Sequence, residues 1–300
     1  MTDDLACWVA LHSVPGLGPM AFRRLLNRFG TVRRVLDDGN DEALSEVLRL
    51  QPSVCEGILK ARARLEWAER LVESLREKGV RVYRCTDPDY PVSLKDLTDA
   101  PPLLYVFGDL RPEDRRSVAM VGTTRPSRRG RDIARGIAMR LVRQGITVVS
   151  GFAQGIDDAS HLSALAEGGR TILCLPFGIR RFRTRSDWPS VREMSGRAVI
   201  LSEQPPETEW ETQAALNRNR VIAALSRAIV IAETSPKGGT MNTFEHAVGL
   251  GRPIFCVKYR EPPDSARGNA IAIGRGARPI ERLGEVSEIV ATVDAPTKVE

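Results

Sequence analysis

The feature that most constrains the fold of this chain is a series of short apolar segments that recurs from Ser117 onwards. The segments read "SVAMV", "ITVVS", "TILCL", "AVIL", "AIVIA" and "PIFCV", and most are followed by a loop and then by a stretch with helical spacing of apolar residues. Short, continuously apolar strands that alternate with helices are typical of a parallel sheet that is covered on both faces. We therefore predict an α/β fold with a Rossmann-like, doubly wound, mainly parallel sheet.

The predicted sheet domain spans residues 79–300. We expect its helices over about 130–144, 155–167, 213–225 and 241–249. Residues 79–116 form a leading extension, in which "VRVYR" and "LLYVF" read as two strands joined by the turn "DPDYP".

Residues 1–78 predict a small all-helical module in front of this domain. Apolar residues recur at helical spacing in "LLNRFGTVRRVL" and in "GILKARARLEWAERLVESLREKG", which reads as one long helix over 57–78 that stops at Gly79. The proline and glycines of "VPGLGP", residues 14–19, predict a tight turn between two helices, as in helix-hairpin-helix or SAM-like modules. This turn either contacts phosphates through its backbone amides or is purely structural, and the sequence leaves both readings open.

Composition excludes several classes of protein. The five cysteines have no close spacing, so neither a zinc site nor a disulfide framework is expected, and we predict no metal and no cofactor. The N-terminus carries no basic-then-apolar signal, and no apolar run approaches the roughly 20 residues that cross a bilayer. We therefore expect a cytoplasmic protein without membrane contact. The net charge of +6 favours a polyanionic partner only mildly.

Glycine- and arginine-containing loops follow several of the predicted strands. They read "GTTRPSRRG" (122–130), "SGFAQG" (150–155), "FGIRRFRTR" (177–185) and "SPKGGTMNT" (235–243). In open parallel sheets, ligands gather beyond the carboxyl ends of the strands. Glycines let the backbone approach an anion, helix N-termini present free N–H groups, and arginines add charged, forked donors. Together these loops predict a site for a phosphate-rich ligand.

The segment "NRNR", residues 217–220, adds to this site, because we expect it to precede a helix at the same edge of the sheet. The predicted contacts are Gly122, Thr123, Arg125, Ser127, Arg128, Arg129, Ser150, Gly151, Gln154, Gly155, Arg180, Arg181, Arg183, Arg185, Arg218, Asn219, Arg220, Lys237, Gly238, Gly239 and Thr240. Asn219 either orients the neighbouring arginines or caps a turn. Phe182 and Trp188 either stack on bases or belong to the core.

Asp157 and His161 lie four residues apart and share one face of a predicted helix. They read either as a structural pair that supports the glycine loop or as an acid–base pair. The structural reading is favoured, because no serine or cysteine nucleophile motif accompanies them. Neither a dinucleotide-binding G-x-G-x-x-G nor a P-loop occurs in the expected place.

In several of these segments the chain resembles the DprA (Smf) family of DNA-processing proteins. The resemblance spans about residues 5–280 and includes "VPGLGPMAFRRLLNRFG", "DYPVSLKDLTDAPPLLYVFGD", "VVSGFAQGIDDASHLSAL", "LSEQPP", "NRNRVIAALS" and "GGTMNTFEHAVGLGRPIF". It implies a homodimeric, non-catalytic protein that binds single-stranded DNA and loads a RecA-type recombinase during natural transformation (competence) or recombination.

The chain departs from the family pattern in its loops. Thr124 stands where the family has an arginine that contacts DNA, and Arg125 follows it. The segment "GIRRFRTRSDWP" replaces the usual one after the third strand, and "SPKGGT" replaces the usual serine-containing loop. We expect no winged-helix domain after residue 280.

Two alternatives come from other classes of protein. "GGTMNTFE" resembles the loop of nucleoside-monophosphate phosphoribohydrolases of the lysine-decarboxylase-like family, with Glu245 as the catalytic candidate, although the spacing differs. A nucleotide-sensing defence protein would use the same edge of the sheet.

Overall fold

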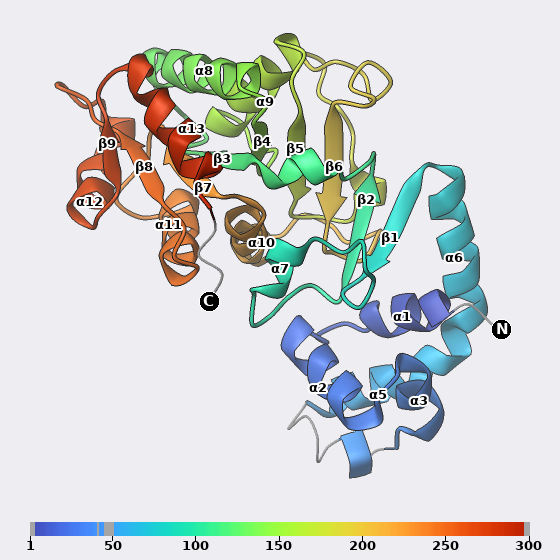
Figure 1. Cartoon of the computed structure of the whole chain (residues 1–300). Helices are drawn as coiled ribbons and strands as arrows, with labels where there is room; N and C mark the ends of the chain where they lie inside the picture. The colour runs from blue at the N-terminus through green and yellow to red at the C-terminus, as the bar shows by residue number, and fades with distance from the viewer. Residues whose placement is uncertain (1–3, 41, 45–50, 297–300) are drawn as a thin grey trace.

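The computed structural model describes residues 4–40, 42–44 and 51–296. Its centre is one nine-stranded sheet with the strand order β1-β2-β6-β5-β4-β3-β7-β8-β9 (Figure 1). The strands are β1 Val80–Arg84, β2 Leu103–Phe107, β3 Ser117–Val121, β4 Thr147–Ser150, β5 Thr171–Leu175, β6 Ala198–Ser202, β7 Ala228–Ile231, β8 Ile254–Val257 and β9 Arg278–Ile280.

The sheet is parallel along the strands from β6 to β9 in the sheet order, and β2 runs antiparallel to both of its neighbours, β1 and β6. The order reverses at β3, which pairs with β4 on one side and β7 on the other. This confirms the predicted α/β, Rossmann-like, mainly parallel sheet. It also brings the loops after β3, β4 and β7 to a single edge.

Helices cover both faces of the sheet. The helices α8 Arg128–Arg143, α9 Ile156–Ala166 and α13 Val286–Asp294 lie on one face, and α7 Val92–Lys95, α10 Thr212–Leu225, α11 Gly239–Gly249 and α12 Asn269–Gly274 lie on the other (Figure 1). Alternate residues of β3 serve the two layers: Val118 and Met120 pack with α8, whereas Ala119 and Val121 pack with α10 and α11. Burial on both faces explains why the strands are apolar without alternation.

The first part of the chain is helical, with α1 Asp4–His12, α2 Pro19–Phe29, α3 Val32–Asp38, α5 Pro52–Ala61 and α6 Leu65–Glu77. The predicted single helix over 57–78 is wrong, because a 3₁₀ turn at Arg62–Arg64 separates α5 from α6. The sequence does not reveal this break, because the buried positions Ile58, Ala61, Ala68 and Leu71 keep helical spacing across it.

The turn between α1 and α2 packs against α5. A Cβ on Gly57 would lie 2.7 Å from Val14 Cγ1, so glycine permits this close approach. The backbone N–H groups of Leu17 and Gly18 donate to Val14 and Gly16, so the protein itself uses these amides. The structural reading of this turn is therefore the one that its geometry favours.

The helical segment (residues 4–77) and the sheet share buried side chains. Trp8, Leu11 and Leu75 belong to the same apolar cluster as Leu103 and Ile200 of the sheet. His12 Nδ1 also lies 3.2 Å from the hydroxyl of Tyr105 in β2. The division into modules 1–78 and 79–300 thus stays a prediction about independent folding. Among the described residues, no helix is both long and apolar enough to span a bilayer.

Candidate nucleic-acid interface

The loops that follow β3 and β4 are in direct contact. Gly155 has φ of 88°, and a Cβ there would lie 2.5 Å from the carbonyl oxygen of Thr123. The N–H of Ile156 donates to that same oxygen at 3.3 Å, and the N–H of Thr123 donates to the carbonyl of Glu233 at 2.8 Å. Thr123, Gly155 and Glu233 thus join the loops after β3, β4 and β7 into one surface.

The N-terminus of α8 is occupied by the carboxylate of Glu233, which is fully buried. Oε2 accepts from Ser127 N and from Ser265 Oγ, both at 2.8 Å, and Oε1 accepts from Ser127 Oγ at 2.5 Å. Gly130 lies so close to this carboxylate that a Cβ would collide with it. Glu233 and the Ser127 hydroxyl thus take the amides of Ser127 and Gly130, so these two amides at the positive helix end are not free for a phosphate.

A second internal carboxylate, that of Asp157 in α9, holds the loop after β4. It accepts from the N–H groups of Gly151 at 3.0 Å and Ala153 at 3.3 Å. Burial raises the pKa of Asp157, and the Arg218 guanidinium partly opposes this rise. The amides of this loop are therefore also used within the protein, and Ser150 Oγ donates to the carbonyl of Met120.

His161 does not pair with Asp157 in the described structure. Its Nδ1 lies 2.6 Å from Thr171 Oγ1, and its Nε2 has no hydrogen-bond partner among the described residues. Burial, with the nearby cations of Arg218 and Arg185, lowers the pKa of His161 to about 3. A fully buried, neutral imidazole of this kind supports the α9–β5 packing and has no access to an external substrate.

The N-terminus of α11 differs from those of α8 and α9 because it is open. Ser235–Gly238 before it and its first residue, Gly239, are exposed. The cap residue Gly238 has φ of 131°, and the first turn contains no acidic residue. Asn219 Nδ2 donates to Gly239 O and to Asn242 Oδ1, both at 3.0 Å, and so ties α10 to this loop. Lys237 forms no ion pair with any described residue, so the charge of this loop is uncompensated.

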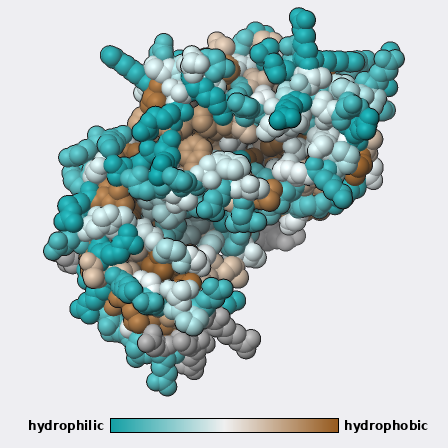
Figure 2. Space-filling view, turned by 180° about the vertical axis from the view of Figure 1, so that it is seen from behind, coloured by the Kyte–Doolittle hydropathy of each residue, from teal (hydrophilic) through white to brown (hydrophobic). Residues whose placement is uncertain are grey.

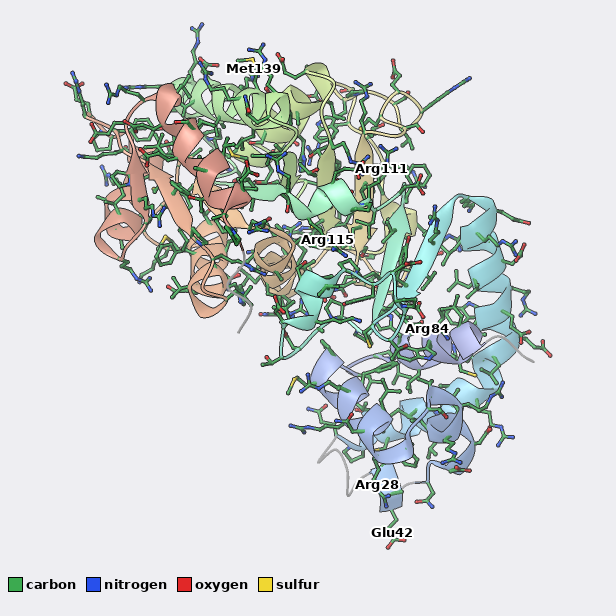
Figure 3. The ribbon with its side chains drawn as sticks, viewed as in Figure 1. Arg28, Glu42, Arg84, Arg111, Arg115 and Met139 are labelled. Carbon is green, nitrogen blue, oxygen red and sulfur yellow. The ribbon has the colours of Figure 1, made fainter. Side chains whose placement is uncertain are left out.

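Exposed, unpaired arginines surround the first turn of α8. Arg125, Arg128 and Arg129 make no ion pair within the described part of the chain, and neither does Arg131, which the sequence reasoning missed. Cations are unfavourable at the positive end of a helix, so this arrangement is explained poorly by stability alone. Figure 3 shows the side chains of α8 projecting outward from the sheet, with Met139 on the outer surface.

The arginines of the arginine loop, residues 177–185, are mostly paired. Arg180 lies 2.7 Å from Glu207, Arg181 lies 3.1 Å from Glu209, and Arg185 pairs with Asp158. Arg183 donates to the carbonyls of Arg180 and Phe182. These pairs reduce the positive charge that this loop offers to an anion.

Arg218 and Arg220 lie within α10 and do not precede a helix, which corrects the prediction for "NRNR". Both are buried, with 6% and 5% exposure. Arg218 donates to the carbonyls of Gly151 at 2.5 Å and Cys174, and Arg220 pairs with Glu203 at 2.8 Å and Asp99 at 2.6 Å. The guanidinium groups of Arg218 and Arg220 thus hold the surrounding loops through buried hydrogen bonds and ion pairs.

The remaining predicted residues also divide into buried ones and ones at the surface of the site. Phe182 and Trp188 are buried with Phe152, at ring-centroid distances of 5.1 and 5.0 Å from it, and so belong to the core. Gln154 is exposed, and Gly122, Thr123, Gly155 and Thr240 are half-buried at the edge. The described residues contain no group of three or more histidine, cysteine, aspartate or glutamate side chains that could hold a metal ion.

Comparison with known proteins gives matches over most of the chain. The family model "DNA recombination-mediator protein A" matches residues 81–291. The chain is 32% identical over 282 residues to "Protein Smf" of Synechocystis, covering 93% of this chain and 70% of that protein.

Two solved structures share the fold. The X-ray structure of DNA processing protein A from Streptococcus pneumoniae matches with a TM-score of 0.74 and 23% identity, over 93% of this chain and 95% of that one. A structure of DNA processing protein A from Helicobacter pylori, whose subject is its single-stranded DNA binding mode, matches with a TM-score of 0.62 and 24% identity, over 71% of this chain and 96% of that one.

Proposed function

Because the chain belongs to the DNA recombination-mediator protein A family, we propose that it binds single-stranded DNA at the edge formed by the loops after β3 and β7. The observation that carries this proposal is the open N-terminus of α11, with Lys237 beside it. The unpaired arginines at the start of α8 lie at the same edge of the sheet, because α8 and α11 follow the neighbouring parallel strands β3 and β7. At α8 the carboxylate of Glu233 accepts from the cap residue Ser127, and at α9 Ile156 N donates to Thr123 O while Asp157 holds the amides of the preceding loop. Backbone amides and uncompensated cations are what a phosphate chain requires.

The proposed contacts fall into three groups. The surface group, which touches DNA directly, is Gly122, Thr123, Arg125, Arg128, Arg129, Gln154, Gly155, Lys237, Gly238, Gly239 and Thr240. The supporting group, which holds the loops from the inside, is Ser127, Ser150, Gly151, Asp157, His161, Arg218, Asn219 and Arg220. The third group, Arg180, Arg181 and Arg183, flanks the bound DNA strand. Glu207 and Glu209 compete with the DNA phosphates for Arg180 and Arg181.

Arg125 takes over the role of the family arginine that Thr124 replaces. It follows Thr124 directly, is exposed, and lies in the loop that contacts Gly155. A forked guanidinium at this place binds phosphate oxygens in two positions at once. The protein uses this arginine as its main contact in the loop after β3.

The protein works as a binder and not as an enzyme. Glu245, the catalytic candidate of the phosphoribohydrolase alternative, is exposed and paired with Arg275, with Oε2 at 2.8 Å from its guanidinium. This hydrogen bond lowers the pKa of Glu245, whereas a general acid or base near neutral pH needs a raised one. We further propose a cytoplasmic homodimer that delivers single-stranded DNA to a RecA-type recombinase in natural transformation or recombination.

Titration of a labelled oligonucleotide, single-stranded and duplex, at two salt concentrations tests the proposal. The single strand should bind more tightly, and its affinity should fall as salt rises, with a slope of about 0.7 per phosphate contact. The variant Arg125→Ala/Lys237→Ala should lose affinity and salt slope. The matched control Arg62→Ala/Arg64→Ala removes two exposed arginines from the helical segment and should change neither.

Equal affinity for single-stranded and duplex DNA, or a larger loss in the control variant, would contradict this placement of the site. Release of free base from adenosine monophosphate, lost in Glu245→Gln, would favour the phosphoribohydrolase instead. Delivery to the recombinase is tested separately, by whether the protein accelerates recombinase filament formation on single-stranded DNA.

A further inference from the structure

A cavity of about 440 Å³ lies between the end of α6 and the arginine loop, over the β1–β2–β6 side of the sheet. Its floor is a row of three side chains on adjacent strands, Val80, Phe107 and Ile200, which the pairing register sets side by side. Leu75 of α6 forms one wall, and the opposite wall is formed by Ile179, Phe182 and Val191. The cavity therefore lies where the end of α6 meets the sheet domain.

The rim of the cavity is basic. Lys78, Arg180 and Arg183 line it, with Glu207 as the acidic residue among the lining side chains. Glu207 pairs with Arg180 at 2.7 Å, whereas Lys78 forms no ion pair with a described residue and Arg183 donates only to backbone carbonyls. Two cations, one on each wall, therefore remain uncompensated above an apolar floor.

The face of the molecule seen from behind in Figure 2 is mostly hydrophilic, with apolar side chains gathered in limited areas. Sites for small ligands are typically cavities of about 300–1,000 Å³ with an apolar lining and a few placed polar groups. The ring of Phe107 is half-buried, so part of it faces the cavity and offers a surface on which an aromatic base can stack.

We propose that this cavity binds a nucleotide, with its base on Phe107 and its phosphate between Lys78 and Arg183. The apolar floor of the cavity suits the base of such a ligand, and the basic rim suits its phosphate. The cavity lies at the β1–β2–β6 end of the sheet, and the proposed DNA surface is built on the loops after β3, β4 and β7. Arg180 and Arg183 are shared, because they line the cavity and also form part of the third group of proposed DNA contacts. The ligand is either a free mononucleotide or the 5′-terminal nucleotide of a DNA strand, since both present a base and a phosphate.

Calorimetric titration with 2′-deoxyadenosine 5′-monophosphate, deoxyadenosine and inorganic phosphate tests this site on the full chain. The nucleotide should bind at least about tenfold more tightly than either half alone. Lys78→Ala/Arg183→Ala should weaken nucleotide binding about tenfold and leave deoxyadenosine binding nearly unchanged. Val191→Trp, at a half-buried position of the wall, should fill the cavity and abolish both.

The matched control Lys60→Ala/Arg70→Ala removes two exposed cations of the helical segment away from the cavity and should bind the nucleotide as the parent does. Circular dichroism on every variant confirms that it is folded. Absence of nucleotide binding to the parent protein, or unchanged binding in folded Val191→Trp, would overturn the proposal.

Competition by a 5′-phosphorylated oligonucleotide separates the two sources of the ligand. Displacement of the nucleotide by this oligonucleotide, but not by the same one without its phosphate, supports the strand terminus; no displacement supports the free nucleotide. The Arg125→Ala/Lys237→Ala variant should still bind the nucleotide. The cavity and the proposed DNA edge can therefore fail independently.

Discussion

Replacing Glu233 by glutamine tests whether a buried carboxylate holds the N-terminus of α8. In the native protein Oε2 accepts from Ser127 N and Ser265 Oγ, and Oε1 accepts from Ser127 Oγ. The amide oxygen of glutamine can retain the two bonds of Oε2. Its NH₂ group then faces the hydroxyl of Ser127, which already accepts from Gly130 N at 2.9 Å, so the hydroxyl proton loses its acceptor.

The cost of Glu233→Gln follows from this count. The hydroxyl of Ser127 is half-buried, and a buried donor without an acceptor costs about 1–3 kcal/mol at most here. The two retained bonds weaken as well, because their acceptor is no longer charged. Removal of a buried charge without a cationic partner among the described residues partly offsets this loss. We expect the free energy of unfolding to fall by about 1–3 kcal/mol.

Urea denaturation followed by circular dichroism measures this loss, and hydrogen exchange at residues 127–131 shows whether it is local. The control Glu245→Gln changes an exposed glutamate, paired with Arg275, and should cost less than about 1 kcal/mol. If Glu233→Gln is as stable as the parent, or if the control loses as much, Glu233 does not hold α8 as we infer.

Three further predictions follow from the same site. Arg218→Ala should lower the free energy of unfolding by about 3 kcal/mol or more, because the carbonyls of Gly151 and Cys174 lose their donor and Asp157 loses a nearby cation, and each buried group left without its partner costs about 1–3 kcal/mol. A thermal melt no lower than that of Arg62→Ala would contradict this. Gly155→Ala should lower both the melting temperature and the affinity for single-stranded DNA, because a side chain at φ of 88° is strained and its Cβ meets the carbonyl oxygen of Thr123. The control is Gly249→Ala, where a Cβ meets nothing within 4 Å. Burial raises the pKa of Asp158 from 3.8 to about 6, so the folded state binds the proton of this carboxyl group more tightly than the unfolded state does. The protonated Asp158 therefore contributes to the free energy of unfolding fully below pH 3.8, and this contribution is lost as the pH rises through about 6. In Asp158→Asn the denaturation midpoint should not show this decrease with rising pH. If the variant and the parent have the same dependence of the midpoint on pH, Asp158 is not the source of the decrease.

The sheet could be predicted from the sequence because its strands are buried on both faces. Continuous apolar runs such as "TILCL" then stand out from the polar loops between them. The strand β9, Arg278–Ile280, was missed because it lies at the edge of the sheet, is short, and exposes Arg278 and Pro279. Helix α12 was missed as well, because its six residues, "NAIAIG", show no clear period.

Which of the predicted residues lie on the surface and which support the loops from the inside could not be predicted, because the sequence around an arginine does not show whether its side chain is buried. Arg218 and Arg125 read alike as cations near glycine loops, yet one is buried against backbone carbonyls and the other is exposed. Whether such a side chain is a surface contact or an internal support depends on partners in other segments of the chain. These partners are Glu203 and Asp99 for Arg220, and Glu233 for Ser127. Such pairs depend on the topology of the sheet, and one sequence does not show them.

The tie between Ser127 and Glu233 also sets an order of events during synthesis. The two residues are 106 positions apart, and Ser265, which completes the contact, is 32 positions further on. At about 5–20 residues per second, several seconds pass on the ribosome between the emergence of Ser127 and that of its partners. During this interval the start of α8 has the Ser127 hydroxyl as its cap but lacks the contact with Glu233. A nascent chain therefore cannot present the edge described here until nearly all of its sheet has been made.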